Sequence, residues 1–211
     1  GGIFANVKLN QRIREHQKVE DVFVFPNMGD GGLSVGAAYL AHMQKTDQAP
    51  MRFHTALLGS NITNEQARDR LENNYPQLQY EYVENIEDRI AQLLAEKNVV
   101  AVVNGKMEYG PRALGNRSIL FHCADASVND WLNTKLHRSE FMPFAPATLV
   151  EDAKSCYIGI DENSQPKDYM TMTYDCTESM KQESPAAVHI DGTARPQILN
   201  EANYPFFYKI L

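Results

Sequence analysis

The chain has 211 residues, 43% of them hydrophobic, and a formal net charge of −7. That length can bury a core and suits one large domain, or one domain with a fragment of another. The acidic charge argues against nonspecific binding to nucleic acid or acidic membranes, since both repel an acidic protein. No apolar run approaches the length of a membrane span.

The chain begins at Gly1 without an initiator Met, so we expect the N-terminus of the gene product to be absent. Its cysteines, Cys123, Cys156 and Cys176, are odd in number and far apart. They show neither zinc spacing nor a disulfide framework, and no signal peptide is visible. These features favour a reducing, cytoplasmic location.

Residues 1–48 predict a helix, a strand and a second helix. Apolar residues recur at helical spacing over 5–13 and 33–41, and residues 22–25 read as a short buried strand. A glycine-rich turn over 26–32 separates the strand from the second helix. One strand and two helices bury too little surface to fold alone, so we interpret this unit as a fragment, followed by a linker over 46–52.

From residue 49 onward, helices and strands alternate early and strands dominate late, which predicts a mixed α/β sheet. The run over 99–103 is apolar without alternation, as expected for a strand buried on both faces. Loops are expected over 159–168 and 176–184. The other predicted strands are 79–83, 118–122, 143–150, 168–174 and 186–190, and helices are predicted to open at capping boxes of Thr63 with Gln66 and Ser127 with Asp130, and at a cap by Asn85.

The loop over 105–118 is the most informative segment, because it follows a predicted strand and contains three glycines and two arginines. Glycine lets the backbone approach a ligand, and each guanidinium offers a planar fork of donors for phosphate or carboxylate. We therefore interpret it as an anion-binding loop. The alternative is a surface loop whose arginines are solvated or pair with Glu108.

Two further clusters are candidates for the same site. Lys135 and Arg138 are three residues apart at a predicted helix end, where an ordinary charge cluster is the alternative. If the segment over 189–197 is extended, its polar side chains share one side, since side chains alternate along a strand. A solvated sheet edge is the alternative there. The residues on that side are His189, Asp191, Thr193 and Arg195.

In the first unit, Asn6 and Asn10 are spaced to share a helical face, and Asp30 lies among glycines at a helix start, where backbone amides favour anions. A plain Asp-Gly turn is the alternative. The chain has no Walker A or serine-hydrolase pattern. The remaining histidines show no zinc signature and are interpreted as surface or packing residues: His16, His42, His54, His122 and His137.

Taken together, these motifs resemble the carbamoyltransferase family that includes nodulation and antibiotic O-carbamoyltransferases. The resemblance covers nearly the whole chain in the correct order. It implies a YrdC-like, C-terminally truncated domain over 49–211, preceded over 1–48 by the tail of a Kae1-like domain of the actin/Hsp70 ATPase type. The matching strings are Gly1-Gly2-x3-Asn6-x3-Asn10, Gly29-Asp30-Gly31-Gly32-x3-Gly36-Ala37-Ala38, 107–120, Glu140-x3-Phe144-Ala145-Pro146 and 189–197.

The resemblance implies a reaction in two steps. The YrdC-like site would make carbamoyl adenylate from carbamoyl phosphate and ATP, with Mg²⁺ accompanying the ATP. The Kae1-like site, which holds a metal ion, would pass the carbamoyl group to a hydroxyl of a small-molecule acceptor. Neither the acceptor nor the choice between monomer and homodimer can be read from the sequence.

The resemblance also assigns residues to these sites. Catalytic roles around the phosphates fall to Arg112, Arg117, Lys135 and Arg138, and substrate or nucleotide binding to Lys106, Gly110, Asn116, Ser118, His189, Asp191, Thr193 and Arg195. Kae1-like nucleotide binding falls to Gly2, Asn6, Asn10 and Gly31, and metal ligation to Asp30, whose histidine partners lie outside this chain. We expect the basic groups to converge in one cavity.

Two departures from the family pattern give an alternative. Met142 stands where many members have arginine, so one phosphate contact is lost or supplied by Arg138. The chain also ends before the segment that normally closes the protein, so the fragment alone is expected to be incomplete as an enzyme. The alternative is a non-catalytic regulatory module of the same fold that binds a nucleotide or anion.

Overall fold

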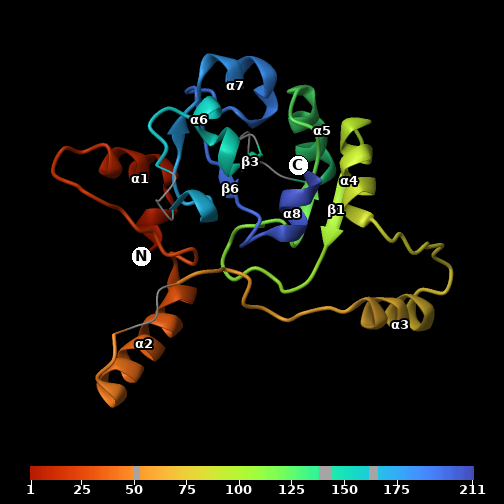
Figure 1. Ribbon diagram of the computed structural model, residues 1–211, viewed down its shortest axis with the longest axis horizontal. Coiled ribbons are helices and arrows are strands. Elements are labelled where there is room, and N and C mark those ends of the chain that lie inside the picture. The colour runs from red at the N-terminus through yellow and green to blue at the C-terminus, as the bar shows by residue number, and fades with distance from the viewer. Residues whose placement is uncertain (50–52, 138–143, 162–165) are drawn as a thin grey trace.

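The computed structural model describes residues 1–49, 53–137, 144–161 and 166–211 (Figure 1). The helices are α1 Val7–Arg14, α2 Leu33–Thr46, α3 Asn64–Asn74, α4 Ile86–Ala95, α5 Ser127–Lys135, α6 Ala153–Cys156, α7 Glu178–Glu183 and α8 Pro205–Ile210. The strands are β1 Val100–Val103, β2 Arg117–Leu120, β3 Ala147–Leu149, β4 Tyr174–Asp175, β5 Thr193–Ala194 and β6 Gln197–Leu199. Short 3₁₀ turns cover Gly2–Ala5, Asp30–Gly32, Val150–Asp152, Pro166–Tyr169 and Pro185–Ala187.

The mixed α/β class is confirmed, but the single larger sheet is not found in the described part of the chain. Its strands pair two by two: β1 with β2 antiparallel, β3 with β6 parallel, and β4 with β5 antiparallel. The prediction that β1 is buried on both faces is wrong. With only β2 beside it, Val102 is buried while Val103 is 64% exposed.

The core is built from clusters around these small sheets. Tyr157, Met172, Tyr174 and Ile198 lie in one cluster, against which Cys123 and Cys156 pack. A second cluster joins α4, β1 and α8, which lie side by side in Figure 1. A third cluster is formed by Ala56, Leu114, Tyr169 and Met170. Burial raises the pKa of the Cys176 thiol to about 11, which disfavours the reactive thiolate.

Helix α1 docks on the second unit through polar groups. Asn10 is fully buried, and its Nδ2 donates to the Thr171 carbonyl at 2.7 Å. The Thr173 hydroxyl donates to Gln11 Oε1 at 2.8 Å. The Arg14 guanidinium lies 4.9 Å from the centroid of the Tyr174 ring. The segment predicted as a strand over 168–174 begins in a 3₁₀ turn and ends in strand β4 at Tyr174, and residues 170–173 between them are irregular, buried and in contact with α1.

Several local predictions are confirmed and others are wrong. The capping box at α3 is present, with Thr63 and Gln66 exchanging side-chain and backbone hydrogen bonds. Helices α4 and α5 form where predicted, but neither is capped as predicted, and Asp125 instead accepts from the Ser127 backbone. Residues 22–25, 79–83 and 186–190 form no paired strand among the described residues. Helix α7 occupies the predicted loop over 176–184.

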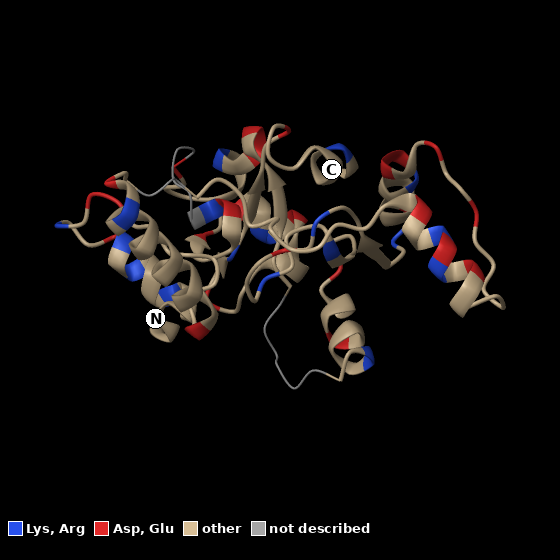
Figure 2. Cartoon of the chain, turned by 90° about the horizontal axis from the view of Figure 1, so that it is seen from below, with Lys and Arg blue, Asp and Glu red and all other residues tan. Residues whose placement is uncertain are grey.

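Two helices lie at the periphery. Helix α2 projects from the rest of the chain, with no buried residue (Figure 1). Helix α3 likewise has no buried residue. Figure 2 shows acidic and basic residues interspersed along α3, whereas α2 contains Lys45 and no acidic residue. None of the helices in the described ranges combines the length and apolarity needed to cross a bilayer.

The docking of α1 predicts a stability effect. Thr173→Val keeps the side-chain shape but removes the donor to buried Gln11, so we expect unfolding free energy to fall by about 1–3 kcal/mol. Urea denaturation followed by circular dichroism measures the change. Thr46→Val is the control, because Thr46 bonds only within exposed α2 and should change stability by less than about 0.5 kcal/mol. Equal effects in the two variants would contradict the prediction.

Candidate functional site

A cavity of about 760 Å³, here called the main cavity, lies beside the loop over 105–118. Its polar wall includes Arg112, Ser118, Arg195 and Gln197. Its apolar wall comes from α4, β2, α8 and the segment over 144–147, and Phe121 and Phe144 meet there edge to face at 5.4 Å between ring centroids. A large pocket with mainly apolar walls and a few convergent polar groups is typical of a small-molecule site.

The loop over 105–118 is held by one buried carboxylate. Glu108 is 8% exposed, and its Oε1 accepts from the backbone N–H groups of Leu114 at 2.8 Å, Asn116 at 2.8 Å and Arg117 at 3.0 Å. Burial alone would raise the pKa of Glu108, but these backbone hydrogen bonds outweigh it and lower the pKa below its ordinary value. The alternative expectation is that Glu108 pairs with the loop arginines. Instead it binds three backbone N–H groups, an arrangement here called the Glu108 clamp.

Arg117 stabilises the loop and does not line the main cavity. Its guanidinium donates to the backbone carbonyls of Asn104 at 2.7 Å, Asn116 at 2.8 Å and Gly105 at 3.1 Å. These bonds join the two ends of the loop where β1 leaves and β2 begins. The expected contact of Arg117 with phosphates is not supported by this geometry, because three of its five N–H donors bond to backbone carbonyls and it does not line the main cavity.

Of the predicted basic groups, the structure brings Arg112 and Arg195 to the main cavity. Lys135 is exposed at the end of α5, with its Nζ 6.0 Å from the Trp131 ring centroid, and does not line the cavity. Arg138 and Met142 lie outside the described residues. The expectation of full convergence is therefore met in part.

The predicted polar face over 189–195 is a turn at 189–192 followed by the two-residue strand β5, rather than one extended strand. Asp191 pairs with Lys8 of α1 at 3.0 Å and accepts from the Thr193 hydroxyl at 2.7 Å. Burial acts to raise the pKa of Asp191, but the bonds from Thr193 and Lys8 outweigh it and lower the pKa to about 2. His189 Nδ1 lies 3.3 Å from the Thr193 hydroxyl, and burial lowers its pKa. Asp191 therefore contacts α1, Thr193 and His189 bond within the segment, and of the four residues Arg195 lines the cavity.

Of the other predicted site residues in the loop, one lines the main cavity and three do not. Ser118 lines the cavity and its Oγ accepts from the Gly115 N–H at 2.9 Å. Asn116 is buried and donates to the Lys106 carbonyl at 2.7 Å, so it stabilises the loop. Lys106 is exposed and does not line the cavity. Gly110 has φ of +118°, and a Cβ there would lie 3.1 Å from the Pro26 carbonyl oxygen.

The first-unit candidates have mostly structural contacts. Asn6 caps α1 by accepting from the Leu9 N–H at 3.0 Å, and Asn10 is buried against the second unit. Gly2 lies in a 3₁₀ turn, and a Cβ at Gly31 would lie 2.5 Å from Asn27 Nδ2. Asp30 is exposed and offers one carboxylate. No group of three or more metal-ligating side chains occurs within the described ranges, so Asp30 fits one ligand position of a metal and cannot hold the ion alone.

Sequence reasoning missed several residues of the main cavity. His122, interpreted as a surface or packing residue, lines it, and its Nδ1 accepts from the Ala124 N–H at 3.2 Å. Gln197 is fully buried and its Nε2 donates to the Leu114 carbonyl at 3.0 Å. Phe121 and His122 directly follow β2, so their position after the strand that leaves the loop was the available signal.

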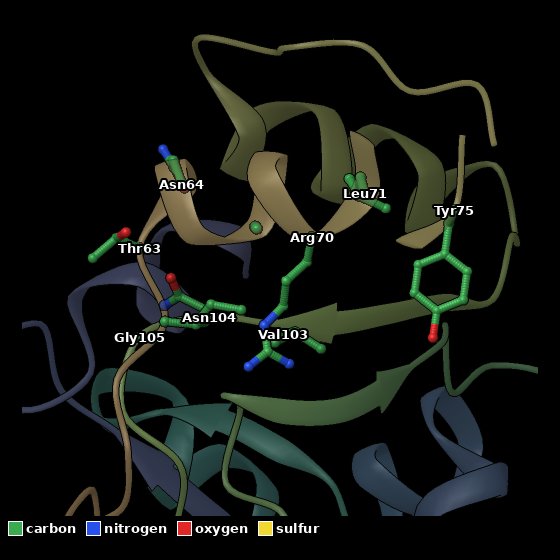
Figure 3. Close-up of a pocket in the computed structure, with 10 residues that line it drawn as sticks. Thr63, Asn64, Arg70, Leu71, Tyr75, Val103, Asn104 and Gly105 are labelled. Atoms are coloured by element: carbon green, nitrogen blue, oxygen red, sulfur yellow. The ribbon is translucent and has the colours of Figure 1, made fainter. Parts of the chain in front are cut away.

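A second, smaller hollow of about 290 Å³ lies between α3 and the end of β1. Figure 3 shows the Arg70 side chain reaching from α3 toward Val103 and Asn104, with Tyr75 to one side. This hollow contains one arginine, whose side chain is exposed. The main cavity is larger and brings together two arginines from distant segments, so it is the stronger candidate.

Comparisons with known proteins match both parts of the chain. A family model described as Carbamoyltransferase C-terminus matches residues 91–211, and one described as Carbamoyltransferase N-terminus matches residues 1–39. An uncharacterized protein of Methanocaldococcus jannaschii is 35% identical over 217 residues, which cover 100% of this chain and 35% of that protein.

Named relatives include two nodulation proteins. Nodulation protein NolO of Bradyrhizobium diazoefficiens is 30% identical, over 100% of this chain and 39% of its own length. Nodulation protein U of Azorhizobium caulinodans is 30% identical, over 94% of this chain and 33% of its own length. The chain thus spans between about a third and two fifths of the relatives it matches.

The Glu108 clamp predicts a pH-dependent loss of stability. Because its folded pKa lies below the ordinary 4.5, the clamp stabilises the fold above that pH and is lost as pH falls through the lower folded pKa. Glu108→Gln should cost about 1–3 kcal/mol at pH 7, and the difference from the unmodified protein should shrink below about pH 4. Urea denaturation across pH measures this. A pH-independent difference, or an equal cost from Glu96→Gln at the exposed residue that follows α4, would contradict it.

The contacts of Arg117 predict a mainly structural effect. In Arg117→Lys a single ammonium replaces the fork that reaches three carbonyls, so we expect a loss of about 1–3 kcal/mol of unfolding free energy. Thermal or urea denaturation measures the loss. Arg89→Lys, which replaces an exposed arginine on α4, is the control and should change stability by less than about 0.5 kcal/mol. An unchanged stability in Arg117→Lys would show that the loop closes without the guanidinium.

Proposed function

The chain belongs to the carbamoyltransferase family, and on this premise we propose that its main cavity forms carbamoyl adenylate from carbamoyl phosphate and ATP. The carbamoyl group would then pass to an acceptor hydroxyl at a second site. The observation that supports this best is the convergence of Arg112 and Arg195, from distant segments, on one cavity of about 760 Å³. Two guanidinium groups suit a reaction whose reactants are polyanions.

We assign residues 49–211 to a YrdC-like domain and residues 1–48 to the tail of a Kae1-like domain. The assignment rests on the resemblance of the motifs, and the mixed α/β architecture is compatible with it. The N-terminal family model matches residues 1–39, within the N-terminal of these two units, and the C-terminal family model matches residues 91–211, within the other. The activity of the whole protein, which is longer than this chain in its relatives, is part of the same proposal.

The proposed first step converts carbamoyl phosphate, water and ATP into carbamoyl adenylate, inorganic phosphate and pyrophosphate. Water cleaves the carbamoyl–phosphate linkage and inorganic phosphate is released, which leaves carbamate. A carbamate oxygen attacks the α-phosphorus of ATP, the bond to the bridging oxygen breaks, and pyrophosphate leaves. Such displacement at phosphorus needs positioning and charge neutralisation more than an acid or base side chain. Neither a redox change nor a covalent enzyme intermediate is required.

The cavity residues suit the parts of this reaction. Arg112 and Arg195 would bind phosphate oxygens and neutralise charge that develops as pyrophosphate leaves. Ser118 would add a hydroxyl donor, since its Oγ accepts from the Gly115 N–H and its hydrogen stays available to a ligand. The apolar surface around Phe121 and Phe144 would bind the base, because edge-to-face rings leave flat apolar surface in the wall.

The second step is proposed for a site outside most of this chain. There Asp30 would supply one ligand to a metal ion, and the metal would polarise the carbamoyl group during transfer. Asp30 is exposed at the start of α2 and is compatible with that place. Its carboxylate is the only part of the metal site that we assign to this chain.

A non-catalytic nucleotide- or anion-binding module is the second candidate. The observation that favours it is the place of Arg117 and Lys135, which do not line the cavity although the resemblance assigns them catalytic roles. A site with fewer basic groups would bind phosphates without accelerating their transfer as strongly. The two candidates differ in turnover rather than in binding.

The proposal predicts pyrophosphate exchange into ATP that depends on carbamoyl phosphate. We expect the full-length protein to catalyse this exchange and Arg112→Gln or Arg195→Gln to lower its rate about 10²-fold or more, since each removes one charge-stabilising donor. Radiolabelled pyrophosphate in the presence of Mg²⁺ measures the rate. Arg70→Gln is the matched control, because Arg70 lines only the smaller hollow, and its rate should stay within twofold.

Each outcome separates the candidates. Loss of pyrophosphate exchange in Arg112→Gln and Arg195→Gln, with unchanged circular dichroism, supports a catalytic role for the cavity. ATP binding by calorimetry with no exchange supports the non-catalytic module. Exchange that survives in both cavity variants would show that the chemistry lies elsewhere in the protein.

A further inference from the structure

A hydrogen bond joins the loop over 105–118 to the glycine-rich turn over 26–32. The Tyr109 hydroxyl donates to the Gly31 carbonyl oxygen at 2.6 Å, across 78 positions of sequence. The same oxygen accepts from Ser34 Oγ at 3.1 Å, in the first turn of α2. The Gly31 carbonyl is therefore held from two sides, by the loop and by the helix that follows the turn.

The two backbones approach closely at this point. A Cβ at Gly110 would lie 3.1 Å from the Pro26 carbonyl oxygen and 3.4 Å from the Asn27 backbone nitrogen, and its φ of +118° is one that L side chains rarely adopt. A side chain at position 110 would therefore strain the loop and crowd the turn. Glycine at this position allows the loop to lie against the turn, beside the Tyr109 hydroxyl.

The Tyr109 ring is fixed within this contact. Phe25, from the segment before the turn, packs edge to face on it at 6.0 Å between ring centroids. Phe25 in turn contacts Phe53 at 5.1 Å. The Tyr109 backbone N–H donates to the Ala56 carbonyl at 2.6 Å. With both ring and backbone held, a shift of the loop would move the hydroxyl and the Gly31 carbonyl together.

Tyr109 is also directly connected to the main cavity. Its neighbour Glu108 clamps the backbone of Leu114, and the residues between them include Arg112, which lines the cavity. Ligand contacts at Arg112 therefore act on a short, tightly bonded loop. The side chain of Tyr109 leaves that loop on the side of the turn, where Asp30 and Gly31 lie.

We propose that Tyr109 is a positioning residue that couples the main cavity to the glycine-rich turn. Ligand binding in the cavity would restrict the motion of residues 108–115. The hydrogen bond from the Tyr109 hydroxyl would then restrict the motion of the Gly31 carbonyl and of the start of α2. This inference rests on the proposed function, because it takes MgATP as the cavity ligand. Coupling between binding sites is reciprocal, so a ligand at the turn would also tighten nucleotide binding.

Hydrogen–deuterium exchange of the full-length protein with MgATP as the probe tests the coupling. We expect MgATP to slow amide exchange over both 105–118 and 29–34, by about five- to tenfold at the turn, the factor that one net hydrogen bond supports. In Tyr109→Phe, MgATP should still slow amide exchange over 105–118. The exchange rate over 29–34 with MgATP should lie within twofold of the rate without it. Tyr80→Phe, which removes a hydroxyl bonded to Glu72 on the exposed surface, should behave as the unmodified protein.

The outcomes distinguish the coupling from the proposed function. If Tyr109→Phe keeps ligand-induced protection at the turn, or loses it over both segments, the coupling is wrong while nucleotide binding by the unmodified protein stands. If MgATP protects neither segment of the unmodified protein, the nucleotide site itself is wrong and the coupling falls with it. Pyrophosphate exchange by Tyr109→Phe within twofold of the unmodified rate would confirm that the cavity is intact.

Discussion

The Glu108 carboxylate is the contact on which the candidate site depends. One buried oxygen accepts from three backbone N–H groups of a loop that would otherwise have unpaired donors in a partly dry environment. The clamp shapes the loop so that Arg112 and Ser118 line the main cavity and Tyr109 faces the glycine-rich turn. Arg117 completes it from the carbonyl side. The carboxylate of Glu108 and the guanidinium of Arg117 thus hydrogen-bond to the backbone of the loop and hold its shape without a ligand.

Helix α1 contacts the rest of the chain through specific polar groups, while Phe25 packs against Phe53 and Tyr109. Buried Asn10 and Gln11 of α1 meet Thr171 and Thr173, and the ion pair of Lys8 with Asp191 holds the turn that follows His189. Buried polar groups stabilise only when they are paired, so this docking has a defined register. Residues that resemble a nucleotide site in sequence are used here to join two parts of the fold.

The sequence predicted segments better than it predicted roles. The capping box of α3, the helices α1, α2, α4 and α5, and the pair of strands flanking the loop could be found from local patterns, because their signals lie within a few residues. Strands were expected over 79–83, 168–174 and 186–190, but of these residues only Tyr174 lies in a paired strand, β4, in the part of the chain that the structure describes. For the segment over 168–174, contacts with α1, more than 150 positions away, override that preference.

By itself the sequence determined the family, the α/β class and the existence of a loop rich in glycine and arginine between two strands, because these depend on motif strings and local periodicity. Only the tertiary structure decided which of the two loop arginines lines the main cavity. Arg112 and Arg117 are the same residue type in one loop, yet the backbone carbonyls of Asn104 and Gly105 take up the second while the first lines the cavity. His122 and Gln197 join the cavity for the same reason: spatial neighbours are set by packing between distant segments, which local patterns do not encode.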